Sequence, residues 1–285
     1  MKKILWLAAL SPLLCLAADP PVIDVHTHTN FSNEPEPYTK IMDSEEEYLK
    51  QLKSVGGVGA VSLGSDDLKD LSPALKSFPV IQCYGVREKV KLAEIERELK
   101  SKRARCVKIY LGYIHRFAHD KAYRPVYKLA EKYDVPVVFH TGDTYSTKAK
   151  LKFADPLTID EVAVDFPKTT FVIAHLGNPW IDSAMEVTYK NPNVYVEASA
   201  MLIGDINSDK EALDTLMIQP IRKAFNFIAD PNKFLFGTDW PLVNIKDYFE
   251  AYKKAIPEKH WCKVFFGNAV KVFRLKELEG KHTCP

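Results

Sequence analysis

The sequence predicts an α/β protein of the (β/α)8 class, a TIM barrel with a C-terminal helix. Short β-rich runs alternate with longer segments of helical period along the chain. Most of these runs are apolar throughout, as parallel strands buried on both faces are. Eight such units within about 250 residues match the size of a TIM barrel. An open doubly wound sheet remains the alternative, because a hydrophobic pattern does not show whether a sheet closes.

Eight strands are expected, each followed by a helical segment. The strands are predicted at residues 22–26, 58–63, 79–84, 105–111, 136–140, 170–175, 194–198 and 233–237. Helical periodicity falls at 43–54, 66–77, 88–101, 120–133, 158–166, 180–190, 209–228 and 246–256, with a tail helix near 258–278. The connections are long enough for helical crossovers between parallel strands.

The first 18 residues have the form of a secretory signal peptide. Lys2 and Lys3 precede an apolar stretch that reaches Ala18, and Cys15-Leu16-Ala17 forms a small-x-small cleavage site. The stretch is shorter than the roughly 20 apolar residues of a membrane span. We therefore expect a signal peptide at 1–18 and a single barrel domain at 19–285. The protein would be exported, periplasmic or secreted, with no stable membrane anchor after cleavage.

Composition restricts the partners. The chain holds 39 Lys and Arg against 37 Asp and Glu, a net charge of only +2. Such a balance indicates no nucleic-acid partner. A small-molecule substrate is the expected partner, and the sequence leaves open whether the protein forms a homo-oligomer.

Four cysteines would remain after signal cleavage: Cys83, Cys106, Cys262 and Cys284. In an oxidising compartment, a bridge from Cys262 to Cys284 could tie down the C-terminal tail. Cys83 and Cys106 lie in apolar strands, where ordinary buried thiols are at least as good an interpretation. No CxxC spacing occurs, which disfavours a cysteine metal site.

The stretch VIDVHTHTN turns polar at His26 and His28, at the end of the first predicted strand. Side chains two residues apart in a strand share a face, so these two imidazoles should project side by side. That arrangement suits a shared metal ion.

Other strands also end in potential metal ligands, where the chemistry of a TIM barrel lies. His140 ends VVFH, His175 ends FVIAH, Asp239 follows the last strand in FGTDWP, and Lys108 lies in VKIY. We expect these side chains to converge on one site. The other histidines, His115, His119, His260 and His282, fall in loop or helix segments and are expected to be peripheral.

The order HxH, Lys, His, His, Asp over strands one, four, five, six and eight resembles the amidohydrolase superfamily. The motifs DVHTH, GVREK, VKIYLG, PVVFHTGD, FPKTTFVIAHLGNPW, NVYVEAS and KFLFGTDWP are similar to its amidohydrolase-related branch. That branch also contains aminocarboxymuconate-semialdehyde decarboxylase and related decarboxylases. The resemblance covers about residues 22–270. The motifs are specific for the superfamily and nearly silent about substrate.

Three neutral imidazoles and a carboxylate with an open position are typical of a catalytic site, with zinc the first candidate. We assign His26, His28, His140 and Asp239 as ligands. A bound water would have a lowered pKa and act as nucleophile, with Asp239 accepting its proton. The resemblance implies that His175 lies beside the metal, where it polarises the substrate carbonyl or steers the water.

The role of Lys108 depends on whether the site binds one metal ion or two. In binuclear members of the superfamily a strand-four lysine is carboxylated and bridges two metals, so that His140 and His175 would bind the second ion. In the branch that this sequence resembles, such a lysine accompanies a single ion. We favour one zinc ion, with Lys108 as a charged group beside the substrate, and keep the second ion as the alternative.

Several residues after the strands are candidates for substrate binding: Arg87, Tyr110, Arg116 and Trp240. Either arginine could hold a substrate carboxylate by paired hydrogen bonds, or could be a solvated surface charge. The predicted function is a metal-dependent hydrolase that attacks an amide, lactone or ester. The alternatives are a metal-dependent decarboxylase of an unsaturated or aromatic acid, and a barrel scaffold without catalysis.

Overall fold

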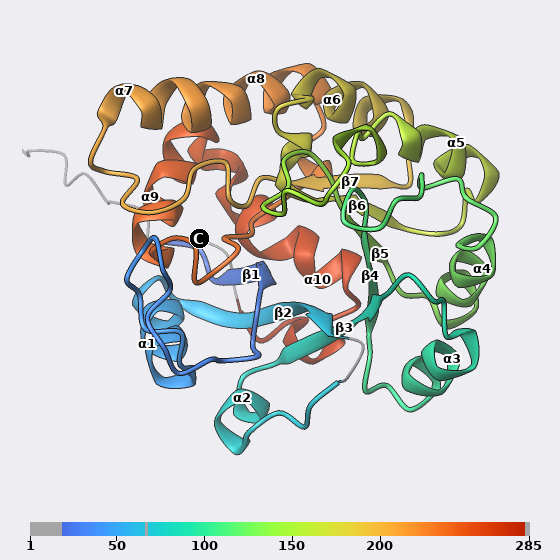
Figure 1. Ribbon diagram of the computed structural model, residues 1–285. Helices are drawn as coiled ribbons and strands as arrows, with labels where there is room; N and C mark the ends of the chain where they lie inside the picture. The colour runs from blue at the N-terminus through green and yellow to red at the C-terminus, as the bar shows by residue number, and fades with distance from the viewer. Residues whose placement is uncertain (1–18, 66–67, 283–285) are drawn as a thin grey trace, which may run out of the picture.

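The computed structural model describes residues 19–65 and 68–282. In this part of the chain eight parallel strands form one sheet, in the order of the sequence (Figure 1). They are β1 (Val22–Thr27), β2 (Gly57–Ser65), β3 (Val80–Val86), β4 (Cys106–Tyr110), β5 (Val137–His140), β6 (Phe171–Ile173), β7 (Val194–Glu197) and β8 (Phe234–Leu235). The predicted signal peptide and Cys284 lie outside the described residues.

The sheet curls so that its last strand meets its first. The Val25 amide donates to the Phe236 carbonyl over 2.9 Å, and the Asp239 amide donates to the His26 carbonyl over 2.7 Å. Higher up, Thr27 forms a parallel bridge with Trp240. The barrel is thus nearly closed, which confirms the TIM-barrel prediction over an open sheet.

Helices surround the barrel (Figure 1). They are α1 (Glu45–Ser54), α2 (Pro73–Ser77), α3 (Leu92–Lys100), α4 (Arg124–Tyr133), α5 (Thr158–Asp165), α6 (Ile181–Lys190), α7 (Lys210–Ala212), α8 (Gln219–Ile228), α9 (Ile245–Ala255) and α10 (Asn268–Val272). Local chemistry sets their ends. The Ser44 hydroxyl caps α1 by accepting from the Glu47 amide, and Asp134, with φ 50°, ends α4. Among the described residues, no helix is both long and apolar enough to cross a bilayer.

Three predicted helices differ from the structure. In the described part of the predicted helix 66–77, residues 68–77, only Pro73–Ser77 is helical, because Ser72 caps a helix whose first turn holds Pro73. The segment 209–228 contains a π-helical stretch, Leu213–Ile218, just before Pro220, which lacks an amide to donate. The tail helix is broken into short pieces, and Arg274, with φ 55°, stops the last turn after α10.

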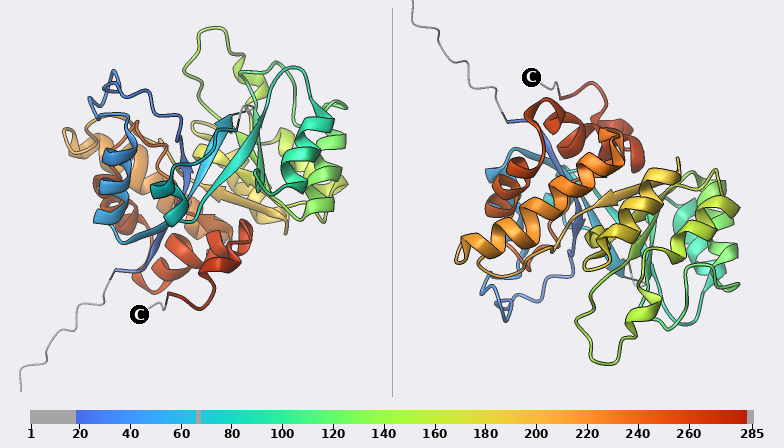
Figure 2. Two further views of the ribbon diagram at one scale, coloured as in Figure 1. Left: turned by 90° about the horizontal axis from the view of Figure 1, so that it is seen from below. Right: turned by 90° about the horizontal axis from the view of Figure 1, so that it is seen from above.

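The C-terminal segment closes one end of the barrel. Its apolar side chains, among them Phe266, Phe273 and Leu275, share one buried cluster with strand residues such as Val61 and Val138. Figure 2 shows this segment at the opposite end from the loops that follow β1 and β5. One end of the barrel is therefore packed, and the other is free to hold a site.

Cys83 and Cys106 form a disulfide, so their interpretation as ordinary buried thiols is wrong. They stand opposite each other in the register of β3 and β4, with Cα atoms 4.3 Å apart. The sequence hides this pairing because it depends on which residues of two strands face each other.

Candidate metal centre

The carboxyl ends of the strands surround a cavity of about 950 Å³. Its lining includes all six strand-end residues singled out in the sequence: His26, His28, Lys108, His140, His175 and Asp239. A second cavity, of about 880 Å³, opens at the other end of the barrel near α2 and contains none of them. The expected convergence is therefore present, and at the expected end.

Asp239 lies beside His26, in β1, and His28, just after it. Its Oδ1 atom lies 3.0 Å from His28 Nε2 and 3.6 Å from His26 Nε2. Neither contact has hydrogen-bond geometry, and Oδ1 is a buried oxygen without a hydrogen bond among the described residues. Burial alone would raise the pKa of Asp239, but His26 and His28 hold it well below its usual range. A cation would satisfy this ionised, unpartnered oxygen.

His140 and His175 form a second pair. His140 Nδ1 lies 3.1 Å from His175 Nε2. The other nitrogen of His140 donates to the Asp143 carbonyl over 2.8 Å, and that of His175 lies 3.2 Å from the Ser199 carbonyl. These acceptors assign the ring protons to the outer nitrogens, so two lone pairs face each other.

The three buried imidazoles, His26, His140 and His175, are neutral at physiological pH. Burial lowers the pKa of His26 and of His140 well below the usual histidine value, and that of His175 to about 4. Uncharged imidazoles are the form that binds metals. The neutral imidazoles and the ionised Asp239 therefore offer lone pairs that no proton occupies, which fits a divalent cation.

The geometry separates the predicted ligands. His26, His28 and Asp239 each offer an atom within 4.8 Å of the others, as a metal triad requires. His140 is not part of that group and faces His175 instead. The predicted four-ligand set is therefore only partly assembled, and the His140–His175 pair could complete it or serve a second ion.

Lys108 rises from β4 into the same cavity. Its ammonium is buried and makes no hydrogen bond within the described residues. Burial lowers the pKa of Lys108 to about 8, against the opposing effect of Glu197 and Asp239. Nζ also stands 5.6 Å from the centre of the Tyr110 ring. A buried cation beside carboxylates and aimed into a cavity is placed to meet a ligand.

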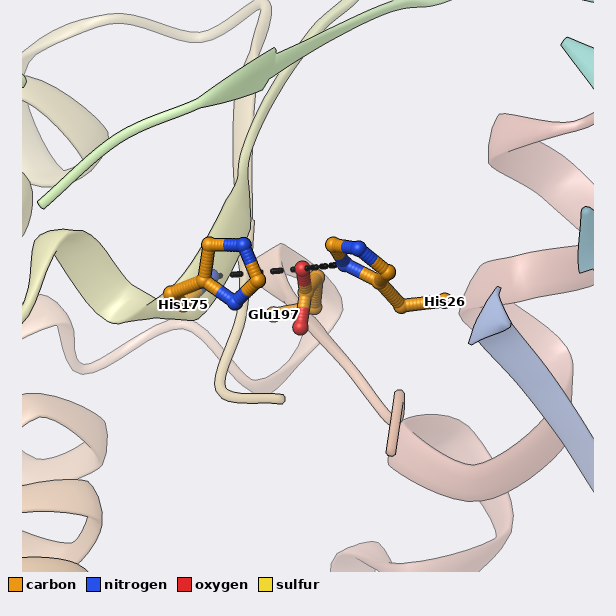
Figure 3. Close-up of side chains that lie close together, drawn as sticks. All are labelled: His26, His175 and Glu197. Carbon is orange, nitrogen blue, oxygen red and sulfur yellow. Dashed lines mark hydrogen bonds and ion pairs between the residues drawn. The ribbon is translucent and has the colours of Figure 1, made fainter. Parts of the chain in front are cut away.

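Glu197 and Ser199, at the end of β7, were missed as site residues. Glu197 Oε1 lies 2.6 Å from His26 Nδ1, and Figure 3 shows the carboxylate between His26 and His175. The motif NVYVEAS carried the signal, because it places a carboxylate at a strand end. Strand-end histidines were selected in the sequence because histidine is rare, and a single glutamate does not stand out in the same way.

Of the predicted substrate contacts, two line the cavity and two do not. Arg87 and Tyr110 line the cavity, and the Arg87 guanidinium lies 5.6 Å from the Tyr110 ring centre. Arg116 lies outside this lining and donates to the Glu88 carbonyl. Trp240 is fully buried against Tyr48, with a ring separation of 4.9 Å. Of the four predicted substrate contacts, the structure therefore places Arg87 and Tyr110 in the cavity lining but not Arg116 or Trp240.

The remaining lining is mainly aromatic and apolar. It contains Tyr113, Tyr145, Met201, Leu202 and Ile203. Tyr113 stands over His140, with ring centres 4.9 Å apart. A polar floor beneath apolar walls is typical of a small-molecule site.

A nearly closed parallel barrel with imidazoles and a carboxylate at its strand ends defines a metal-dependent TIM-barrel enzyme. A family model described as Amidohydrolase matches residues 86–275, more than half of the chain. The chain belongs to this family, and with it to the amidohydrolase superfamily. The comparison with curated proteins finds no match.

Solved structures share the fold at low identity. An uncharacterised TIM-barrel protein from Bordetella bronchiseptica is 20% identical, with a TM-score of 0.67 over 89% of this chain and 98% of that one. A probable 2-pyrone-4,6-dicarboxylic acid hydrolase from Acinetobacter baumannii, with citric acid bound, is 15% identical, with a TM-score of 0.62 over 89% and 99%. A 2,6-dihydroxybenzoate decarboxylase from Rhizobium is 14% identical, with a TM-score of 0.61 over 90% and 99%.

Proposed function

We propose that this protein is a metal-dependent hydrolase that cleaves an amide, lactone or ester of a small organic anion. One observation carries the proposal. Lone pairs of His26, His28 and Asp239 gather beside a cavity open to water, and no hydrogen bond satisfies the carboxylate oxygen. A site for amide or ester hydrolysis needs such a cation position together with a proton acceptor.

His26, His28 and Asp239 would hold one divalent ion, with His140 as the further ligand. Nitrogen and carboxylate donors favour zinc. A divalent ion bound there supplies a Lewis acid and lowers the pKa of water. The alternative is a second ion on His140 and His175 with a carboxylated Lys108, whose amine has the lowered pKa that this chemistry needs.

Asp239 and His175 have different roles in the proposed reaction: Asp239 transfers the proton, and His175 orients the water. Asp239 stays ionised, so it can accept a proton from the attacking water and return it to the leaving group. His175 presents an unprotonated Nε2 to the site because its proton lies on Nδ1. It can therefore accept a hydrogen bond from water but cannot donate one to a substrate carbonyl. Of its two predicted roles, this supports steering the water.

Lys108 and Arg87 supply the positive charge for substrate binding. The buried Lys108 ammonium reaches the floor of the cavity, while Arg87 lies higher, against the Tyr110 ring. The lining also contains the carboxylates of Glu88 and Asp143. The case for an anionic substrate therefore rests on the buried Lys108, which has no hydrogen-bond partner within the described residues, and on the planar Arg87 guanidinium, which suits a carboxylate.

Decarboxylation is the second candidate. The same two cations and the aromatic lining would also fit an unsaturated or aromatic carboxylic acid. Structures of similar fold include the Rhizobium decarboxylase and a 5-carboxyvanillate decarboxylase from Novosphingobium aromaticivorans with bound manganese. Both functions use the same metal position, so only turnover separates them.

The deciding experiment is a substrate panel on protein purified without chelator, after its metal content has been measured. Lactones, esters and amides of small organic acids are tested for acid release, and aromatic acids for release of CO2. Hydrolysis without CO2 release is the expected result. CO2 release alone would replace hydrolysis by the second candidate. A protein that binds no metal and turns over neither class would be a scaffold.

We also propose that the protein works outside the cytoplasm. The disulfide between β3 and β4 adds to the N-terminal signal, because such bonds persist in oxidising compartments. The mass of the mature protein tests this: loss of about the first 18 residues is expected, and retention of Met1 to Ala18 would contradict it.

A further inference from the structure

We infer that Glu197 is a positioning residue that fixes the ring protons of His26 and His175 together, with Ser199 as the link between them. Glu197 itself contacts no part of the cavity where a substrate would lie. The consequence for metal binding rests on the proposed function, but the arrangement of protons can be tested without metal.

The Glu197 carboxylate is buried and surrounded by donors. Oε1 lies 2.6 Å from His26 Nδ1 and accepts from the His175 amide over 3.2 Å (Figure 3). Oε1 also accepts from the Ser199 hydroxyl over 3.1 Å, and Oε2 accepts from the Ser199 amide over 2.6 Å. The His175 amide, the Ser199 amide and the Ser199 hydroxyl donate to this carboxylate whatever the state of His26, and three such donors stabilise the anion of Glu197.

The anion determines the tautomer of His26. Because a carboxylate only accepts, Nδ1 must carry the ring proton, and Nε2 keeps its lone pair. Nε2 is the atom that lies 3.6 Å from Asp239 Oδ1. Glu197 thereby directs the lone pair of His26 toward the metal position.

Ser199 determines the tautomer of His175 in the same way. Its hydroxyl oxygen lies 3.0 Å from both His26 Nδ1 and His175 Nδ1 and donates its single proton to Glu197, so it can only accept from the two ring nitrogens. The Ser199 carbonyl, 3.2 Å from the same nitrogen, is also an acceptor. His175 therefore carries its proton on Nδ1 and presents a bare Nε2 to His140.

The packing around Glu197 makes room for this contact. Gly237 follows β8 beside it, and a Cβ atom there would lie 2.8 Å from the His26 Cβ and 3.1 Å from Glu197 Oε2. Any larger residue would push the carboxylate and the imidazole apart. The glycine in FLFGTDW is thus explained by the approach of two side chains.

Carboxylates behind metal-bound histidines orient the ring and raise its basicity, and their loss weakens metal binding by about 10- to 100-fold. The test compares Glu197→Gln and Glu197→Asp with the wild type. Aspartate keeps the charge but is too short for the 2.6 Å contact. Glu98→Gln is the matched control, because Glu98 is also a buried carboxylate, on α3, that pairs with Arg97 and Arg103 and not with a histidine.

Two measurements are made on each protein: the zinc dissociation constant by chelator competition, and the ring nitrogen NMR spectrum of the metal-free form. We expect both Glu197 variants to bind zinc about 10- to 100-fold more weakly and to change the ring-nitrogen spectrum of His26, identified with His26→Ala, because aspartate no longer reaches Nδ1 and the glutamine carbonyl is an uncharged, weaker acceptor. Glu98→Gln should match the wild type in both. If one Glu197 variant does not fold, the other still gives both readouts.

The outcomes are separable. Unchanged tautomers and zinc affinity within about threefold in the Glu197 variants would overturn the inference. Wild-type protein that binds no zinc would contradict the proposed function, and the metal-free spectra would still decide whether Glu197 fixes the ring protons. A wild-type spectrum with His26 protonated on Nε2 would also overturn it.

Discussion

His140 and His175 meet through ring nitrogens only 3.1 Å apart, and neither nitrogen has a proton to place between them. Each ring gives its proton to a backbone carbonyl on its far side. Two facing lone pairs repel unless a cation or a proton lies near them. This relationship, next to the unpartnered oxygen of Asp239, is the main reason to expect that the metal stabilises the protein.

Metal removal should lower thermal stability and abolish activity. A ligand that binds only the folded state adds about 2.7 kcal/mol to the free energy of unfolding at 100 times its dissociation constant. We expect the melting temperature to fall by several degrees after chelator treatment and to return with zinc. Calorimetry at several zinc concentrations measures this, and a melting temperature independent of zinc would contradict it.

Loss of one triad member should remove the metal. His28→Ala and Asp239→Ala each leave two of the three grouped donors. We expect metal content below a tenth of the wild-type value and activity reduced at least about 1,000-fold. His119→Ala is the control, since His119 does not line the cavity and its contacts are a stacked Phe117 ring and an exposed ion pair with Glu161, a kind of pair that contributes little. Full metal content in Asp239→Ala would place the ion elsewhere.

Titration of Lys108 should make kcat/KM decrease at alkaline pH. Because the pKa of Lys108 is lowered to about 8, its ammonium is present below that pH and lost as the pH rises through it. A bound cation would move this midpoint lower still. We therefore expect kcat/KM of the metal-loaded wild type to fall with a midpoint at or below about pH 8, and Lys108→Arg to move this fall to higher pH because arginine stays charged.

Lys108→Met tests the metal count. With Lys108 as a charged group beside the substrate, the variant should keep its metal and lose activity. A fall from two ions to one per chain would show instead that a carboxylated Lys108 bridges two metals. Elemental analysis of both proteins distinguishes these results.

Arg87 should act on substrate binding more than on turnover. Arg87→Met removes the guanidinium that lines the cavity, and a charge-assisted pair is worth about 1.5–3 kcal/mol, or roughly 10- to 150-fold in KM. Arg116→Met is the matched control, because Arg116 does not line the cavity. Equal effects of the two variants would show that Arg87 has no particular role in binding.

The disulfide should matter for stability and not for chemistry. It closes a loop with a sequence separation of 23 residues, for which loop-closure entropy gives about 3 kcal/mol. Replacing Cys83 and Cys106 by alanine should lower the free energy of unfolding by about 2–4 kcal/mol, measured by denaturant titration. Metal content at 25 °C should stay at the wild-type level, and its loss would show that the bond also shapes the site.

Much of the fold was readable because burial on both faces leaves a direct pattern. Continuous apolar runs such as VVFH and TFVI predicted strands within one or two residues of β5 and β6. Helix pieces were harder. The segment 258–278 has helical periodicity throughout, yet packing into the barrel end broke it into short turns.

The candidate site was predicted as a set of strand-end residues, since strand polarity brings all carboxyl ends to one rim. Its internal arrangement was not predictable in this way. Arg116 follows β4 just as Arg87 follows β3, and both guanidinium groups donate to a backbone carbonyl, but only that of Arg87 lines the cavity. The direction of a long side chain depends on neighbours that are distant in sequence.

By itself, the sequence determined the barrel and the kinds of donor atoms at its rim, because both follow from residue type and from position along each strand. Only the tertiary structure decided that Cys83 meets Cys106, that Glu197 lies behind His26, and that His140 faces His175. Those pairings depend on register between strands and on which ring nitrogen finds an acceptor. Distances of a few ångströms between remote residues have no counterpart in the linear order of the chain.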